Sequence, residues 1–288
     1  MAASGQTGRL LVCATPIGNL ADVTLRVLDE LREADVCLAE DTRVTKRLFA
    51  RYGIDTPLER FDEATASAKT PRVLERIAAG ETVALVSDAG TPGISDPGSR
   101  LVAACIDAEL PVDVLPGPSA VITALVASGL PTHAFFFGGF FPRKQGDRVR
   151  LLASLRDLDA TLVFFESPRR LASALAAIAE QMPGRRGAVA RELTKVHAEV
   201  VRGTVEELAA AFASREVKGE VVVLVGPPTG ATQAVSDEDL AFEVEQMMRG
   251  GSSRSDAIKR VAQIRGVPKS RVYDAAHRAK EARKEAER

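Results

Sequence analysis

Three short turns rich in glycine and proline are the segments of this chain that most suggest binding chemistry. Each follows a run of residues typical of a buried strand, and the carboxyl ends of parallel strands are where α/β sheets bind ligands. Glycine in such a turn lets the backbone come close to a ligand. One turn alone would be ordinary, but three at one sheet edge favour a small-molecule site. The turns are TPIGN at 15–19, SDAGTP at 87–92 and PGPSA at 116–120.

The sequence patterns of several other chemistries are missing. The chain has no GxxxxGK[ST] phosphate loop, no GxGxxG turn and no HExxH zinc motif. Its histidines, His133, His197 and His277, are widely separated, and its three cysteines form no CxxC pair. Zinc chemistry and P-loop hydrolysis are therefore not expected.

The elements that must position the turns alternate regularly in the first half of the chain. Short β-branched runs alternate with amphipathic helical runs, which predicts an α/β domain with a largely parallel sheet. Asp96 followed by Pro97 indicates a helix start. The predicted strands are 9–14, 36–39, 82–86 and 112–115, and the predicted helices are 24–34, 42–51, 70–79 and 98–108.

A second set of strands follows the LPGP junction at 115–118. Ser167-Pro168 is predicted to open one helix, and Thr204 with Glu207 to form a capping box at another. The strands are predicted at 135–137, 161–165, 187–191, 197–202 and 221–225.

We therefore expect an N-terminal α/β domain over 1–116, a second over 117–228 and a C-terminal part over 229–288. Residues 226–234 are rich in Gly, Pro and Thr and predict a linker. Helices predicted at 237–248, at 254–264 and from 269 onward form a small module with helix-turn-helix spacing.

Composition supports a folded protein of a reducing compartment. The 288 residues are 45% hydrophobic, which excludes a disordered or collagenous chain. Three cysteines suit no disulfide framework, and the apolar run at 10–14 is too short for a signal-peptide core, so we expect a cytoplasmic protein. The stretch 114–142 lacks charged residues, but prolines and glycines interrupt it, which indicates buried core rather than a membrane span.

Charge is unevenly distributed along the chain. The total of 38 Lys+Arg against 39 Asp+Glu gives a net charge of -1. Residues 249–280 hold nine basic and two acidic side chains, which is +7 and leaves -8 for the rest. This stretch is predicted to track RNA phosphates, the alternative being an ordinary solvated helical surface. The predicted RNA-binding residues here are Arg254, Lys259, Arg260, Lys269 and Arg271.

Seven motifs, in order, carry a resemblance to a known family. They are TPIGNLADVTLR at 15–26, AEDTR at 39–43, SDAGTPGISDPG at 87–98, LPGPSA at 115–120, FFPRK at 140–144, FFESPRR at 164–170 and REL at 191–193. Together they resemble the ribosomal RNA small-subunit methyltransferase I family, the RNA-modifying branch of the tetrapyrrole methylase fold. The resemblance runs from about residue 9 to residue 225, and the C-terminal tail also fits.

The resemblance implies a two-domain class III S-adenosylmethionine (SAM) methyltransferase, typically a homodimer, with no DNA or membrane partner. Its substrate would be the ribose 2′-hydroxyl of a decoding-region cytidine in 16S rRNA within the small ribosomal subunit. Asp88 would anchor the cofactor's ammonium or ribose, unless it only caps its own turn. Carried over motif by motif, the cofactor pocket would comprise Pro16, Ile17, Asp88, Gly90, Thr91, Ser119 and Ala120.

Methylation of a hydroxyl requires alignment and a group that accepts its proton. The candidates for the acceptor are Glu40 and Asp41, at a predicted strand end, and Glu192 in the second domain. Arg43 and Lys144 are expected to contact phosphate or ribose, and Arg143 to join them. The alternative for the EDTR segment is a solvated ion-pair cluster.

Two other functions stay open from the sequence. One is a methylase of corrin or sirohaem precursors, although TPIGN stands in place of the GxGxGD-like turn of that branch and such a substrate needs no basic tail. The other is a non-catalytic RNA-binding or ribosome-assembly factor that retains a nucleoside pocket.

Overall fold

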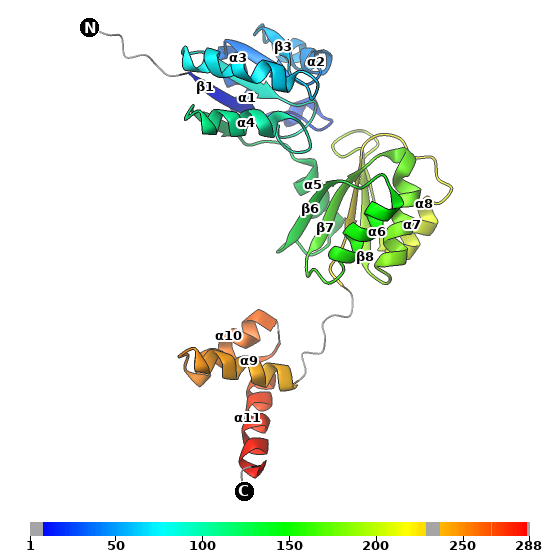
Figure 1. The fold of residues 1–288 in the computed structure, drawn as a ribbon. Coiled ribbons are helices and arrows are strands. Elements are labelled where there is room, and N and C mark those ends of the chain that lie inside the picture. The colour runs from blue at the N-terminus through cyan, green and yellow to red at the C-terminus, as the bar shows by residue number, and fades with distance from the viewer. Residues whose placement is uncertain (1–7, 229–236, 266, 287–288) are drawn as a thin grey trace, which may run out of the picture. The chain divides into compact units, whose positions relative to one another are not determined.

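The computed structural model describes residues 8–228, 237–265 and 267–286, with side chains as far as residue 279. The chain forms two compact units, Met1–Pro228 and Thr229–Arg288, which we describe separately (Figure 1). Two sheets lie in the larger unit, one on either side of the predicted division at residue 117. The α/β class with a C-terminal helical module is confirmed.

The first sheet is parallel throughout, with strand order β3-β2-β4-β1-β5. A parallel sheet needs both faces covered, and helices α1 and α2 pack on one face while α3 and α4 pack on the other. The strands are β1 (Arg9–Cys13), β2 (Val36–Ala39), β3 (Leu58–Arg60), β4 (Thr82–Val86) and β5 (Val112–Leu115). The helices are α1 (Leu25–Glu33), α2 (Thr42–Tyr52), α3 (Ala66–Ala78) and α4 (Gly98–Asp107), with a short 3₁₀ turn, η1 (Leu20–Asp22), before α1.

The second sheet is mixed, with order β6-β7-β10-β8-β9, and only β6 and β7 run parallel. Helix α5 covers one face, and α6, α7 and α8 cover the other. The strands are β6 (Phe135–Phe140), β7 (Thr161–Glu166), β8 (Arg186–Arg191), β9 (Glu199–Thr204) and β10 (Val221–Val225). The helices are α5 (Ala120–Ser128), α6 (Gln145–Ser154), η2 (Pro168–Arg170), α7 (Leu171–Gln181) and α8 (Val205–Phe212).

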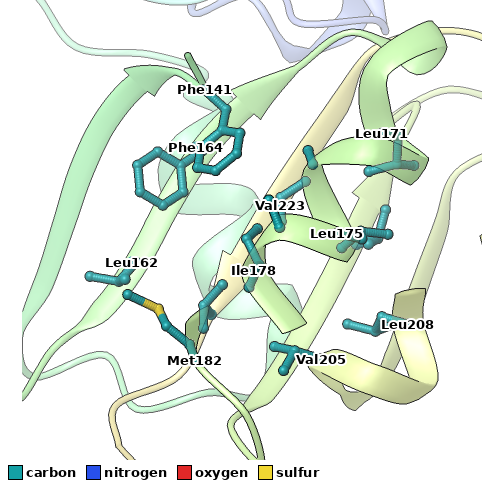
Figure 2. Packing of buried hydrophobic residues seen from close by; sticks show 14 of the residues in the cluster. Phe141, Leu162, Phe164, Leu171, Leu175, Ile178, Met182, Val205, Leu208 and Val223 are labelled. Carbon is teal, nitrogen blue, oxygen red and sulfur yellow. The ribbon is translucent and has the colours of Figure 1, made fainter. Parts of the chain in front are cut away.

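The core of this second sheet anchors the strand ends that carry functional motifs. Ile178 and Leu175 of α7 face Val223 of β10 (Figure 2). Phe141, just after β6, lies edge-on to Phe164 of β7, with ring centroids 5.2 Å apart (Figure 2). Because aromatic side chains bury large areas in defined geometries, this pair fixes the end of β6 against β7.

The smaller unit has a hydrophobic core of its own. It comprises α9 (Asp237–Arg249), α10 (Arg254–Arg265) and α11 (Lys269–Ala286). Leu240, Val261 and Val272, one from each helix, are almost fully buried in that core. Most of the predicted linker at 226–234 lies outside the described residues.

The predicted elements agree closely with the structure at most strands. β2, β4, β5 and β10 have the predicted bounds, and the capping box of Thr204 and Glu207 is present. In the charge-free stretch 114–142, β5 ends, α5 forms and β6 begins, and no described helix is long and apolar enough to cross a membrane.

Several predicted details were wrong. Strand β9, predicted at 197–202, spans Glu199–Thr204. Helix α3 begins at Ala66 rather than at residue 70, and strand β3 was not predicted. Strand β6 continues to Phe140. Pro97 precedes α4 instead of opening it, although the Asp96 carboxylate accepts the Gly98 N–H at 2.7 Å and so still caps the helix.

Candidate functional site

A cavity of about 410 Å³ lies at the carboxyl ends of β1, β2, β4 and β5. Its size is that of a small-molecule pocket. Part of the cavity lining comes from the first half of the larger unit, counted up to the start of α5. These residues are Ile17, Glu40, Ser87, Asp88, Ala89, Gly90, Thr91, Ile94, Ser95, Asp96, Ser119, Ala120 and Val121. The second sheet contributes Phe140, Phe165, Glu166, Ser167, Pro168, Gly219, Glu220, Val221 and Val222.

The first two glycine-containing turns are joined by backbone hydrogen bonds. The Thr15 N–H donates to the Gly90 carbonyl at 2.9 Å, and the Gly90 N–H donates to the Thr15 carbonyl at 3.0 Å. The Thr15 hydroxyl also donates to the Ser87 carbonyl at 3.1 Å. Gly90 has φ +79°, a left-handed conformation that strains any residue with a Cβ. A side chain at this position would therefore strain the backbone of the cavity wall.

The third turn approaches β1 closely. A Cβ added to Gly117 would lie 2.8 Å from the Cβ of Ala14, so a side chain there would push the turn away from the sheet. Ser119 follows as the N-cap of α5, with its hydroxyl accepting the Ile122 N–H at 3.4 Å. The three turns thus meet at one sheet edge, as the sequence predicted.

The cavity lining is acidic. It contains the carboxylates of Glu40, Asp88, Asp96 and Glu220, and no Lys, Arg or His occurs among the described lining residues. Glu166 also borders the cavity, but its side chain is fully buried and paired with Arg170 and Arg148. Burial, followed by the charge of Asp88, raises the pKa of Glu40. Burial also raises the pKa of Asp88. A cavity of this charge favours a cationic ligand group, and carboxyls with raised pKa values are better proton acceptors than ordinary ones.

Asp41 and Arg43 form an exposed ion pair beside the cavity. Arg43 Nε and Nη2 donate to the Asp41 carboxylate at 3.0 and 2.6 Å, which lowers the pKa of Asp41 to about 2. The Arg43 side chain is 86% exposed. The Asp41 N–H donates to Asp88 Oδ1 at 3.0 Å, so this pair supports the cavity wall from outside. That bond also shows that Asp88 connects two turns and does not merely cap its own.

Glu192 lies behind the cavity wall. Its carboxylate accepts from Lys195 Nζ at 2.8 Å and from the Glu220 N–H at 3.0 Å, and the hydrogen bond to Lys195 lowers the pKa of Glu192. Its backbone has φ +49°. Two residues later Thr194 accepts the Asn19 N–H at 3.1 Å, which links this loop to the first turn of the N-terminal half. Glu192 thereby fixes the position of Glu220, which does line the cavity.

The structure brings most of the predicted cofactor residues together. Ile17, Asp88, Gly90, Thr91, Ser119 and Ala120 all line the cavity, as does Glu40. Pro16 is buried next to Ile17. Pro16, Asp41, Arg43, Arg143, Lys144 and Glu192 do not line the cavity. Arg143 and Lys144 are exposed, just beyond the lining residue Phe140.

Several lining residues were missed. Ser167 and Pro168 belong to the FFESPRR motif and Phe140 to FFPRK, so those motifs contained a signal. The segment from Gly219 to Val222 also lines the cavity, and no sequence pattern pointed to it because only the sheet order brings it there.

In the smaller unit, acidic residues of α9 compensate part of the basic charge. Arg271 Nε lies 3.3 Å from Asp237 Oδ1, and Arg265 pairs with Glu243. Over 237–286 the sequence has eleven basic and nine acidic residues, a net +2 rather than the +7 of the shorter stretch. The predicted phosphate-binding cations Arg254, Lys259, Arg260, Lys269 and Arg271 lie on α10 and α11.

Comparisons with known proteins show similarity to a family and to named relatives. The sequence profile of the tetrapyrrole (corrin/porphyrin) methylases matches residues 9–209. A protein of Mycobacterium tuberculosis named ribosomal RNA small subunit methyltransferase I is 48% identical over 274 residues, which cover 93% of this chain and 94% of that protein. A protein of the same name from Bacillus subtilis is 39% identical and covers 94% of each chain.

Solved structures share the fold at lower identity. A uroporphyrin-III C-methyltransferase from Thermus thermophilus superposes with a TM-score of 0.56 at 23% identity, covering 79% of this chain and 98% of that one. A diphthine synthase superposes with a TM-score of 0.61 at 17% identity, covering 76% and 90%. At these identities the likeness concerns the fold alone.

Proposed function

Because the chain belongs to the tetrapyrrole methylases, and within them to the ribosomal RNA small subunit methyltransferase I family, we propose that it methylates 16S rRNA. Its methyl donor is SAM, the cofactor of this methyltransferase family. The finer proposal is methylation of the ribose 2′-hydroxyl of a decoding-region cytidine, within the small ribosomal subunit. Such a substrate is cytoplasmic, in keeping with three unpaired cysteines.

The single observation that carries the proposal is the acidic cavity at the meeting point of the three turns. SAM has a cationic sulfonium and an ammonium group, and the cavity offers carboxylates without a competing basic side chain among its described lining residues. We propose that Pro16, Ile17, Asp88, Gly90, Thr91, Ser119 and Ala120 would hold the cofactor. When bound, it supplies a methyl group already activated by the sulfonium.

Among the candidate proton acceptors, the contacts favour Glu40. It lines the cavity and has a raised pKa, whereas Asp41 is paired with Arg43 and Glu192 with Lys195. In the proposed step the Glu40 carboxylate would accept the proton of the ribose hydroxyl while its oxygen bonds to the methyl carbon. The bound SAM would supply that methyl group and keep the electron pair of the broken carbon–sulfur bond as a neutral thioether. Asp41 and Glu192 then act by holding Asp88 and Glu220 in place.

RNA binding is proposed for exposed cations outside the cavity. Lys144 and Arg143 lie beside its mouth, and Arg43 extends into solvent next to it. In the smaller unit Lys259, Arg260 and Lys269 are exposed and would contact further phosphates. Arg254 and Arg271 are proposed as well, although both are half-buried and Arg271 is paired with Asp237. Phosphate contacts of this kind position an RNA without reading its sequence.

The direct test is transfer of labelled methyl groups from SAM to isolated small ribosomal subunits, followed by mapping of 2′-O-methyl groups in 16S rRNA. Label in a single decoding-region cytidine is the expected result. Transfer only to a porphyrinoid would instead make the chain a tetrapyrrole methylase. Binding without any transfer would make it a ribosome-assembly factor.

We also propose a homodimer, as the family resemblance implies. An exposed apolar face on α5 supports it, because Val126 and Ile122, one helical turn apart, are 68% and 48% exposed. Light scattering should give twice the 30.6 kDa mass of the chain, and Val126→Glu should shift that mass toward the monomer. A monomeric wild-type protein would contradict this proposal.

A further inference from the structure

Three charged side chains are clustered next to the cavity lining, on the face of the second sheet opposite α5. Glu166 ends β7, Arg148 belongs to α6 and Arg170 to η2. The Glu166 side chain is completely inaccessible, that of Arg148 is 5% exposed and that of Arg170 is 26% exposed. Charged groups are buried to this extent only when they are paired, so the contacts among them are informative.

The contacts of this cluster connect two chain segments. Glu166 Oε1 accepts the Ser167 N–H at 2.6 Å and lies 2.5 Å from Arg170 Nη2. Arg148 Nη2 lies 3.9 Å from Glu166 Oε2, and Arg148 Nε donates to the Pro142 carbonyl at 2.7 Å. The segment at 140–144 is thus tied to the segment at 166–170 through Arg148 and Glu166.

Stability alone does not account for the cluster. It contains two guanidinium groups and one carboxylate, and Glu166 Oε2 and Arg170 Nη1 are buried without a hydrogen-bond partner among the described residues. Each unsatisfied buried polar atom lowers the stability of the fold. Apolar residues of similar volume would often be at least as stable, so a positioning role is the better explanation.

Both connected segments have an inner and an outer side. On the inner side Phe140, Ser167 and Pro168 line the cavity. On the outer side Arg143, Lys144 and Arg169 are exposed, and none of the three forms an ion pair with a described residue. Exposed cations therefore adjoin the lining residues of a cavity whose interior is acidic, an arrangement that attracts a polyanion to the outer side and a cationic group to the interior.

We infer that Arg148, Glu166 and Arg170 are positioning residues that hold Arg143, Lys144 and Arg169 as a preformed phosphate-binding rim at the cavity mouth. Arg169 is the new member of this rim, since neither the sequence motifs nor the comparisons gave it a role. Its neighbour Arg170 points to Glu166 instead, so adjacent arginines have different tasks. The inference rests on the proposed RNA substrate.

The rim is tested with Arg169→Gln, using purified small ribosomal subunits as the probe. Binding is measured at several salt concentrations, because each lost phosphate contact reduces the slope of log K against log salt by about 0.7–0.9. We expect that reduction and an affinity loss of about three- to tenfold. Arg186→Gln is the matched control, since Arg186 is exposed at the opposite end of the sheet. Equal behaviour of the two variants would overturn the rim.

The positioning role is tested with Arg148→Lys, which keeps the charge but loses the guanidinium fork that reaches Pro142 and Glu166. We expect weaker subunit binding with a SAM dissociation constant within twofold of wild type. Ser173→Ala removes only the Ser173 hydroxyl, which accepts from Arg148 Nη1 at 3.1 Å, and serves if the lysine variant unfolds. Wild-type subunit affinity in the folded variant would contradict the positioning role.

These binding measurements do not depend on methyl transfer. If wild-type protein transferred no methyl group to the subunits, the proposed reaction would be wrong, while the salt slopes would still decide whether the rim binds phosphate.

Discussion

Glu40 lines the cavity and also has a raised pKa. A carboxyl whose pKa is higher in the folded than in the unfolded protein opposes folding when ionised. This loss of folding stability is complete above the pKa of the carboxyl in the folded protein, and it disappears as the pH falls below its pKa in the unfolded protein. The same environment that makes Glu40 a good base therefore lowers the stability of the protein at neutral pH.

Glu40→Gln should slow single-turnover methyl transfer by about a hundredfold or more, because general bases contribute at least that much. It should also raise the melting temperature slightly at neutral pH. The wild-type rate should decline as the pH falls through the raised pKa of Glu40, and this decline should be absent in the variant. Asp41→Asn is the control, and unaltered rates in both variants would remove these carboxylates from the mechanism.

Gly90→Ala should separate backbone strain from ligand binding. Gly90 and Gly53 both adopt left-handed φ values, +79° and +61°, so alanine should cost each site about 1–2 kcal/mol of stability. Only Gly90 lines the cavity. Calorimetric titration should therefore show a weaker SAM affinity in Gly90→Ala and an unchanged one in Gly53→Ala; equal affinities would show that the second turn does not contact the cofactor.

At the scale of elements, the sequence best predicted those helices and strands whose ends are set by local chemistry. Fully apolar β-branched runs such as 221–225 gave correct strand ends, whereas β3 is a short edge strand of half-exposed residues with no apolar run to reveal it. The predicted start of α3 at residue 70 lies next to Pro71, although in the structure this proline is inside the helix. The helix instead begins after a local pair in which Thr65 N–H donates to Asp62 Oδ1 and Asp62 N–H donates to Thr65 Oγ1.

Pro71→Ala should stabilise the protein. Proline inside a helix lowers the stability of the folded protein by about 3 kcal/mol. Replacing it also stabilises the unfolded chain by about 1 kcal/mol, because that chain gains conformational entropy, so the net gain in the free energy of unfolding is about 2 kcal/mol. Pro71 is exposed and does not line the cavity, so SAM affinity should not change. Urea unfolding measures the gain, and a lower midpoint at unchanged slope would contradict it.

At the scale of the whole molecule, the nearly neutral net charge combines an acidic-leaning body with a C-terminal unit of both signs. The basic surface of α10 and α11 was predictable from composition, but its partial compensation by α9 required the ion pairs. The cavity shows the same limit of sequence-based prediction. Motifs in the first half of the larger unit predicted one wall, whereas the other wall depends on the order of the strands in the second sheet.

Removal of the residues after Ala234 should weaken binding to small ribosomal subunits by about tenfold or more and lower its salt dependence, since several cations are lost. SAM affinity should persist because the cavity lies wholly in the larger unit, which has its own cores. Filter binding and calorimetry measure the two affinities. Equal subunit binding by the shortened chain would show that the C-terminal unit is not an RNA-binding module.

The three cysteines provide a built-in reporter of opening in the first sheet. Cys13 and Cys37 are buried on one side of it and Cys105 on the other, and burial raises the pKa of Cys13 to about 12 and that of Cys105 to about 11. Alkylating reagents attack thiolates, so the native protein should resist them until this half opens. Cofactor at a hundred times its dissociation constant should slow the alkylation about a hundredfold, which turns mass spectrometry into a measurement of ligand affinity without an engineered label.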